Sequence, residues 1–109
     1  MAFGSSSPNF IYPRPASGLS DERLTVSTAV VQFSSIATWG ENGLCRMVLF
    51  DIQTEDVMVT LDGSTPSATN GHQLYAGQNY TWSYDTIKAA KFICQGSADA
   101  VIHASPLTF

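Results

Sequence analysis

The sequence predicts an all-β protein, a single β-sandwich or jelly-roll-like domain at residues 23–109 that follows an extended N-terminal arm at residues 1–22. Short runs of β-branched and aromatic residues recur at close, fairly even spacing, and Gly, Pro, Asn or Asp separates them. A long amphipathic helical pattern is missing from the whole chain. The length of 109 residues favours one domain with one hydrophobic core.

Seven segments have the composition and alternation of strands. The segment at 57–61 is the clearest, because Val57, Val59 and Leu61 fall on one face of an extended chain. The Asp62-Gly63 pair that follows it predicts a tight turn. The segment at 23–33 changes the phase of its apolar residues, which predicts a bulge or break near Ser27. The predicted strands are residues 23–33, 44–53, 57–61, 72–75, 79–84, 91–94 and 100–105.

The strand at 44–53 is the most hydrophobic and is expected at a central position in a sheet. Residues 34–43 are predicted to form a connection that ends in an Asn42-Gly43 turn. Residues 85–90 are compatible with one helical turn, with Asp85 as its N-cap. Pro106 is expected to end the last strand and leave a short apolar tail.

The N-terminal arm is rich in proline, which opposes regular strand pairing. Bulky apolar residues nevertheless lie among its prolines, and they need a surface to cover. Either they pack on the domain's own sandwich or they reach a neighbouring subunit in an assembly. These residues are Phe10, Ile11 and Tyr12.

The charge distribution argues against nucleic acid as a partner. The formal net charge is −4, and the five cationic residues are scattered along the chain. No run of residues is long and apolar enough for a membrane span, and the N-terminus lacks the pattern of a signal peptide. We therefore expect synthesis in a reducing cytoplasm, where Cys45 and Cys94 would be buried small hydrophobes. A Cys45–Cys94 disulfide is the alternative if their strands pair.

No group of residues has the pattern of a catalytic or metal site, so we expect neither enzymatic activity nor a cofactor. His72 and His103 lie in no motif that would activate a nucleophile, and His103 is better interpreted as a half-buried strand residue. Four acidic residues could meet at one end of a sandwich and bind Ca²⁺, but a solvated acidic turn is the preferred interpretation. They are Asp51, Glu55, Asp56 and Asp62.

Aromatic residues recur in the segment at 79–84, where Tyr80, Trp82 and Tyr84 would share one face of a strand. Such a row can form a sugar-binding platform. The preferred interpretation is that this face belongs to the core or to a subunit interface, where Tyr and Trp are also enriched.

Residues 57–109 contain a pattern of five short segments. The pattern comprises a strand that ends in V-T-L-D-G-S-x-P, an A-T-x-G turn, a short L-Y-A-G strand, an A-x-K-F-I strand and a closing strand of small residues. The corresponding segments are Val59-Thr60-Leu61-Asp62-Gly63-Ser64-Thr65-Pro66, Ala68-Thr69-Asn70-Gly71, Leu74-Tyr75-Ala76-Gly77, Ala90-Lys91-Phe92-Ile93 and Ala100-Val101-Ile102-His103-Ala104.

This pattern resembles small virion proteins of tailed bacteriophages. The resemblance implies a structural protein without enzymatic activity, located in the virion and made in the cytoplasm of the bacterial host. Head decoration (cement) proteins fit the length best. Such proteins bind the lattice of the major capsid protein, often as homotrimers, and bridge neighbouring subunits. The expected contact residues are those of the arm, Phe10, Ile11 and Tyr12, and those of a polar loop, Ser64, Thr65, Pro66, Thr69 and Asn70.

Other functions stay open at this point. A neck or tail component of the virion is one alternative, and a carbohydrate-binding module that uses Tyr80 and Trp82 is another. The segment Leu61–Pro66 also resembles the L-D-G-S-x-P turn of the Ig-like accessory domains of chitobiase-type enzymes. Those domains lie within larger secreted chains.

Overall fold

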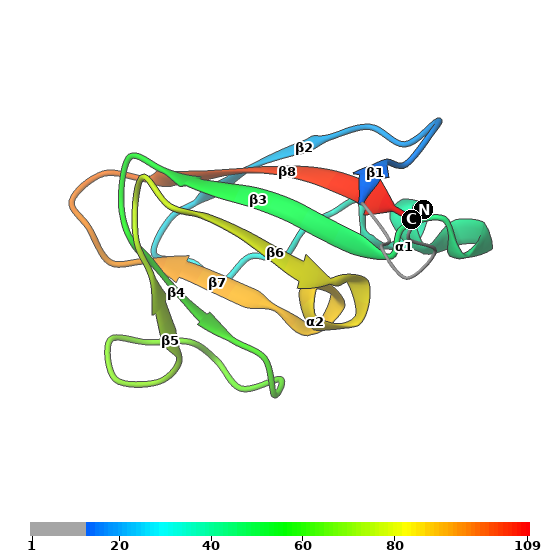
Figure 1. The fold of residues 1–109 in the computed structure, drawn as a ribbon. Coiled ribbons are helices and arrows are strands. Elements are labelled where there is room, and N and C mark those ends of the chain that lie inside the picture. The colour runs from blue at the N-terminus through cyan, green and yellow to red at the C-terminus, as the bar shows by residue number, and fades with distance from the viewer. Residues whose placement is uncertain (1–12) are drawn as a thin grey trace, which may run out of the picture.

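The computed structural model describes residues 13–109, which fold into two β-sheets packed face to face (Figure 1). The all-β sandwich-like class predicted from the sequence is confirmed. Phe10, Ile11 and Tyr12 lie outside the described residues. No helix in the described part of the chain is long and apolar enough to cross a membrane.

One sheet has five strands and the other has three. The five-stranded sheet contains β1 (Arg14–Pro15), β2 (Glu22–Val26), β3 (Met47–Gln53), β6 (Asn79–Ser83) and β8 (Ala100–Thr108). The three-stranded sheet contains β4 (Val57–Thr60), β5 (His72–Leu74) and β7 (Lys91–Cys94). The helical segments are α1 (Ile36–Gly40), the 3₁₀ turn η1 (Glu41–Gly43) and α2 (Tyr84–Ala89).

The two longest strands, β3 and β8, form the centre of the larger sheet. They are antiparallel, and β6 pairs with the other side of β3, so the predicted central position of β3 is confirmed. Both β1 and β2 pair with the other side of β8. Arg14–Pro15, which falls within the predicted arm, is thus held by the sheet.

The core lies between the sheets and follows the alternation of each strand. In β3, Phe50 is fully buried while its neighbours Leu49 and Asp51 are exposed. Burying one face of each sheet removes the apolar side chains from water, which is the main stabilising term of such a sandwich. The largest buried side chains are Trp39, Phe50, Phe92, Ile52, Ile87 and Ile102.

Both cysteines are buried and free, which confirms the first interpretation and makes the disulfide alternative wrong. The Cys45 thiol donates to the Met47 carbonyl at 3.4 Å, and the Cys94 thiol donates to the Ala98 carbonyl at 3.3 Å. Burial raises the pKa of the Cys45 thiol, so this residue stays a neutral thiol at neutral pH.

The predicted strand at 23–33 breaks where the apolar phase changes. β2 ends at Val26, and the chain then crosses to the smaller sheet, where Val31 bridges to Phe92 of β7. The connection that follows is more regular than expected, since it contains α1 and η1. The Glu22 carboxylate fixes its start by accepting hydrogen bonds from the backbone N–H groups of Ser34 and Ser35, at 2.9 and 2.8 Å.

The predicted strand at 79–84 is one residue too long, and the predicted N-cap is wrong. Ser83 has extended backbone angles, and its Oγ accepts a hydrogen bond from the Thr86 N–H at 3.2 Å. Ser83 is therefore the N-cap of α2, and Asp85 lies in the first turn. Tyr84 belongs to the helix and leaves the strand face of Tyr80 and Trp82.

The last strand continues through Pro106 to Thr108, so the predicted apolar tail is part of the sheet. Strand β8 tolerates the proline because of where its missing N–H would point. The backbone groups of Pro106 face the side of β1 and β2, and its carbonyl accepts from the Ala16 N–H at 3.1 Å. On that side no strand pairs with β8 at Pro106, which lies between the residues that pair with β1 and those that pair with β2.

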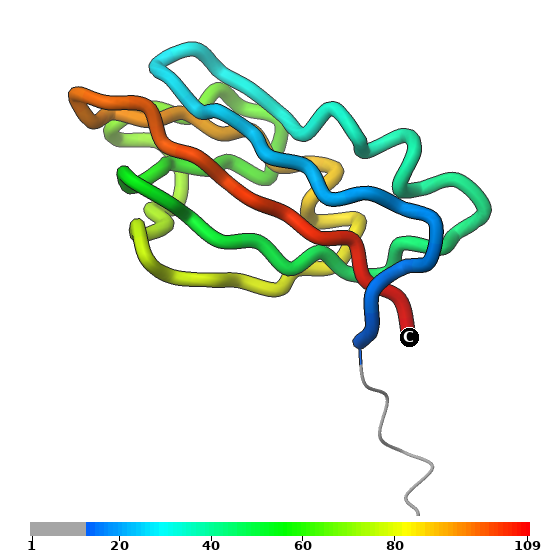
Figure 2. Tube along the Cα trace, turned by 90° about the horizontal axis from the view of Figure 1, so that it is seen from above, coloured from blue at the N-terminus to red at the C-terminus, as the bar shows by residue number. Residues whose placement is uncertain are grey.

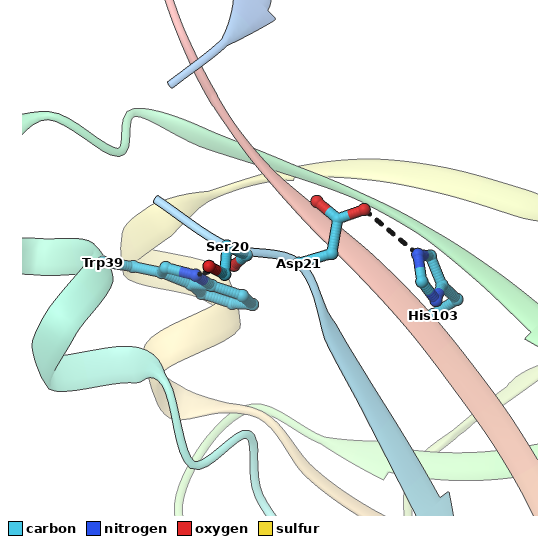
Figure 3. A network of polar contacts seen from close by, with 4 residues as sticks. All are labelled: Ser20, Asp21, Trp39 and His103. Carbon is cyan, nitrogen blue, oxygen red and sulfur yellow. Dashed lines mark hydrogen bonds and ion pairs between the residues drawn. The ribbon is translucent and has the colours of Figure 1, made fainter. Parts of the chain in front are cut away.

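Trp39 connects α1 to the segment that precedes β2. Its side chain is 1% exposed, and its indole N–H donates to the Ser20 carbonyl at 2.9 Å (Figure 3). The ring also packs on Phe33, with ring centroids 5.7 Å apart. This residue thereby joins α1, the core and the segment before β2.

Replacing Trp39 with Phe should lower the free energy of unfolding by about 1–3 kcal/mol, because the indole donor is lost and a cavity is left. Chemical denaturation followed by far-UV circular dichroism would measure the change. Tyr75→Phe is the control, since Tyr75 is 55% exposed and its substitution should change stability by less than about 0.5 kcal/mol. Equal stability of the two variants would contradict the role given to Trp39.

Candidate interaction surface

The candidate site is the loop at residues 61–71, here called the Asp62 loop, which joins β4 to β5 in the smaller sheet. It begins with the predicted Asp62-Gly63 turn. Gly63 has φ +87°, and the Asp62 carboxylate accepts hydrogen bonds from the Ser64 N–H at 3.0 Å and the Ser64 hydroxyl at 2.6 Å. The bonds from Ser64 hold the pKa of the Asp62 carboxyl below its ordinary value of 3.8, so it is ionised at neutral pH.

Asn70 closes the Asp62 loop from the other end. Its side-chain amide donates to the Ser64 hydroxyl at 3.0 Å and to the Thr65 carbonyl at 2.9 Å. Its backbone carbonyl accepts from the Ser67 N–H at 2.9 Å. One side chain therefore joins the two halves of the loop and gives it a defined shape.

Two residues outside the loop anchor it to the smaller sheet. The Thr60 side chain, which is buried, donates to the Ser64 carbonyl. The Lys91 ammonium group on β7 donates to the Gly63 carbonyl at 2.9 Å. No local pattern predicts Lys91 as an anchor of this loop, because it lies 28 residues from Gly63 and only the pairing of β4 with β7 brings them together.

The five predicted contact residues of this loop differ in exposure. Thr65, Thr69 and Asn70 are exposed, Ser64 is half-buried and Pro66 is buried. The structure thus brings all five into one ordered loop and presents three of them to solvent. Their role in contacting another protein stays a prediction.

The Asp62 loop contributes to the walls of two open depressions. One has a volume of about 410 Å³ and includes Asp62, Asn70 and His72. The other has a volume of about 260 Å³ and includes Glu55, Asp56 and Ala68. Both are wide and shallow, so they suit contact with a protein surface better than enclosure of a small molecule.

The histidines are apart from each other and have different surroundings. His103 of β8 is half-buried, as predicted, and its Nε2 lies 3.1 Å from a carboxylate oxygen of Asp21 (Figure 3). In the strand register it stands opposite Arg23 and Asp51. His72 is exposed at the start of β5.

The acidic residues 51–62 form no cluster that could hold a metal ion among the described residues. Asp56 has a structural role, since one carboxylate oxygen accepts from the Gln73 amide at 2.9 Å and the other from the Ala76 N–H at 2.8 Å. These bonds join the turn before β4 to β5 and to the turn that follows it.

The aromatic residues of β6 pack against the core and form no open platform. Phe50 of β3 contacts the Tyr80 ring in a stacked arrangement at 5.5 Å and the Trp82 ring edge-on at 4.9 Å. Tyr84 is turned away by α2, and its hydroxyl donates to the Ile36 carbonyl at 2.7 Å. The face predicted as core or interface is thus the inner face of the larger sheet.

The chain has no match in comparisons with protein-family models, curated proteins and solved structures. The resemblance to virion proteins therefore depends on the segments quoted above.

Replacing Asn70 with Ala should loosen the Asp62 loop without unfolding the domain. Two hydrogen bonds are lost, each with a net value of about 0.5–1.5 kcal/mol. Amide hydrogen exchange at Ser64 and Ser67 should then become roughly 5- to 100-fold faster, while the amides of β3 and β8 keep their rates. Thr69→Ala is the matched control in the same loop, and an equal effect there would contradict the role of Asn70.

Proposed function

We propose that this protein is a structural component of a tailed-phage virion that decorates the head and stabilises the assembled lattice of the major capsid protein. It acts by binding and has no chemical reaction of its own. Its place is the virion, after synthesis in the cytoplasm of the bacterial host. The resemblance of residues 57–109 motivates this function.

The observation that supports the proposal is that β1, the first described strand, and the Asp62 loop belong to different sheets. The arm enters the domain through β1, which pairs with the end of β8 in the larger sheet. The Asp62 loop follows β4 in the smaller sheet. Contacts made from both layers would let the sandwich touch two neighbours at once, which is what bridging a subunit boundary requires.

Stabilisation of the shell would follow from mass action. A protein that binds the assembled lattice and not the separate subunits shifts the equilibrium toward the assembled state. Ordered polar groups favour this binding, because the Asp62 loop loses little conformational entropy when a partner covers it. The arm would add apolar contact area through Phe10, Ile11 and Tyr12.

The first test is the copy number per particle, measured by quantitative mass spectrometry of purified virions. Decoration requires a number comparable to that of the major capsid protein. A few copies per particle would instead indicate a neck or tail component, and absence from the particle would overturn the virion function altogether.

A second test separates the contribution of the arm. Deleting residues 1–12 should weaken attachment to heads at least about tenfold, as expected for the loss of a small set of apolar anchors. The cut precedes Pro13, because Ala16 and the pairing of β1 belong to the folded domain. The control is Val30→Ser, which removes a single exposed apolar side chain outside both proposed contact segments. Equal binding by the deletion and the full chain would exclude the arm as a contact.

A further inference from the structure

Strand β6 forms one margin of the larger sheet. It pairs with β3 on one side, and no described strand pairs with its other side. Figure 2 shows β6, in yellow, at the edge of the sheet with β3 next to it. An edge of this kind presents backbone N–H and C=O groups that another strand can bind.

The hydrogen bonds at both ends of β6 show which backbone groups face outward. The Ile52 N–H donates to the Gln78 carbonyl at 3.0 Å, and the Tyr84 N–H donates to the Arg46 carbonyl at 3.0 Å. Because bonded pairs alternate in an antiparallel ladder, the even-numbered residues of β6 bond to β3. The backbone groups of Asn79 and Thr81 and the N–H of Ser83 therefore face the open side, whereas the Ser83 carbonyl begins the hydrogen bonding of α2.

This edge lacks the features that usually prevent strand addition. The sequence Asn-Tyr-Thr-Trp-Ser contains no charge and no proline, and its register with β3 is continuous, without a bulge. The other margins differ: β2 begins with Glu22 and Arg23, and β5 has only three residues. Among these margins, β6 is therefore the one best suited to pair with another strand.

We propose that β6 pairs antiparallel with β6 of a second copy of this chain, about a two-fold axis at Thr81. The sequence of β6 has the symmetry that this pairing needs. A polar residue stands at each end, an aromatic residue on each side of the centre, and Thr81 at the centre. The occupant is a second copy because the uncharged strand meets no like charge when it faces itself.

The register follows from the direction of the backbone groups. The two Thr81 residues exchange both of their backbone hydrogen bonds, and the Asn79 carbonyl of each copy accepts from the Ser83 N–H of the other. Tyr80 stands opposite Trp82 of the second copy, on the inner face. Both rings are half-buried at the sheet margin, so this contact covers surface that remains exposed in the monomer.

The result is a dimer with one continuous sheet through both copies. This inference goes beyond the proposed function and does not depend on it, since the pairing involves only this chain. It gives a stoichiometry of two, whereas the resemblance to decoration proteins implies three.

Sedimentation velocity over a range of concentrations tests the pairing in the full chain. The wild-type protein should form dimers. Thr81→Lys places two ammonium groups opposite each other on the axis and should weaken dimerisation on the order of tenfold, and Thr81→Glu should do the same. Mixing the two variants should restore dimers, because only a self-opposed residue 81 brings the Lys and Glu side chains together.

The control variant is Thr25→Lys, which changes an exposed threonine on β2 at the opposite side of the sheet and should leave dimers unchanged. A second measurement needs no variant: hydrogen exchange at Thr81 and Ser83 should slow as the concentration rises, while exchange at Tyr80 and Trp82 stays constant. A monomer at every concentration, a trimer, or a dimer that is insensitive to Thr81→Lys would overturn the proposal.

Discussion

The ladder between β3 and β8 is the constraint on which the rest of the structure depends. It fixes the alternation that buries Phe50 and Ile52 on one side and Ile102 and Ala104 beside them. Every other strand of the larger sheet pairs with one of these two. The smaller sheet then covers the apolar face that the ladder presents, so its position follows from the same register.

Local signals were sufficient for the fold class and for several turns. Alternation over 57–61 and the Asp62-Gly63 pair predict a strand and its end from neighbouring residues. The structure has the turn and a strand that is one residue shorter, Val57–Thr60, with Leu61 exposed. The change of apolar phase near Ser27 likewise marks the point where the chain leaves one sheet for the other. These features depend on the alternation of side chains and on the residues of turns, and both are determined by short segments of the sequence.

Features that depend on distant partners were not predictable in this way. Pro106 is tolerated within a strand because β1 and β2 leave a gap beside it, and no local pattern reveals that gap. The shape of the Asp62 loop depends partly on Lys91, which β7 supplies. The N-cap of α2 depends only on nearby residues, but Ser83 and Asp85 are both good capping residues and lie two positions apart. Only the backbone angles in the structure distinguish them. For the candidate site, residue types predicted the loop and its turn, whereas exposure and burial within it required the packed structure.

The central position of β8 also determines the order in which the protein can fold. The ribosome makes β8 after every other described strand, yet β1, β2 and β3 all need it as their partner. Until β8 emerges, β3 can pair only with β6, and β1 and β2 have no partner strand in the larger sheet. Folding is therefore a late event dominated by contacts between distant parts of the chain, which makes it slow compared with helical proteins of this size. During that interval the nascent chain exposes unpaired apolar strands, and its need for protection by chaperones is greatest just before synthesis of β8 is complete.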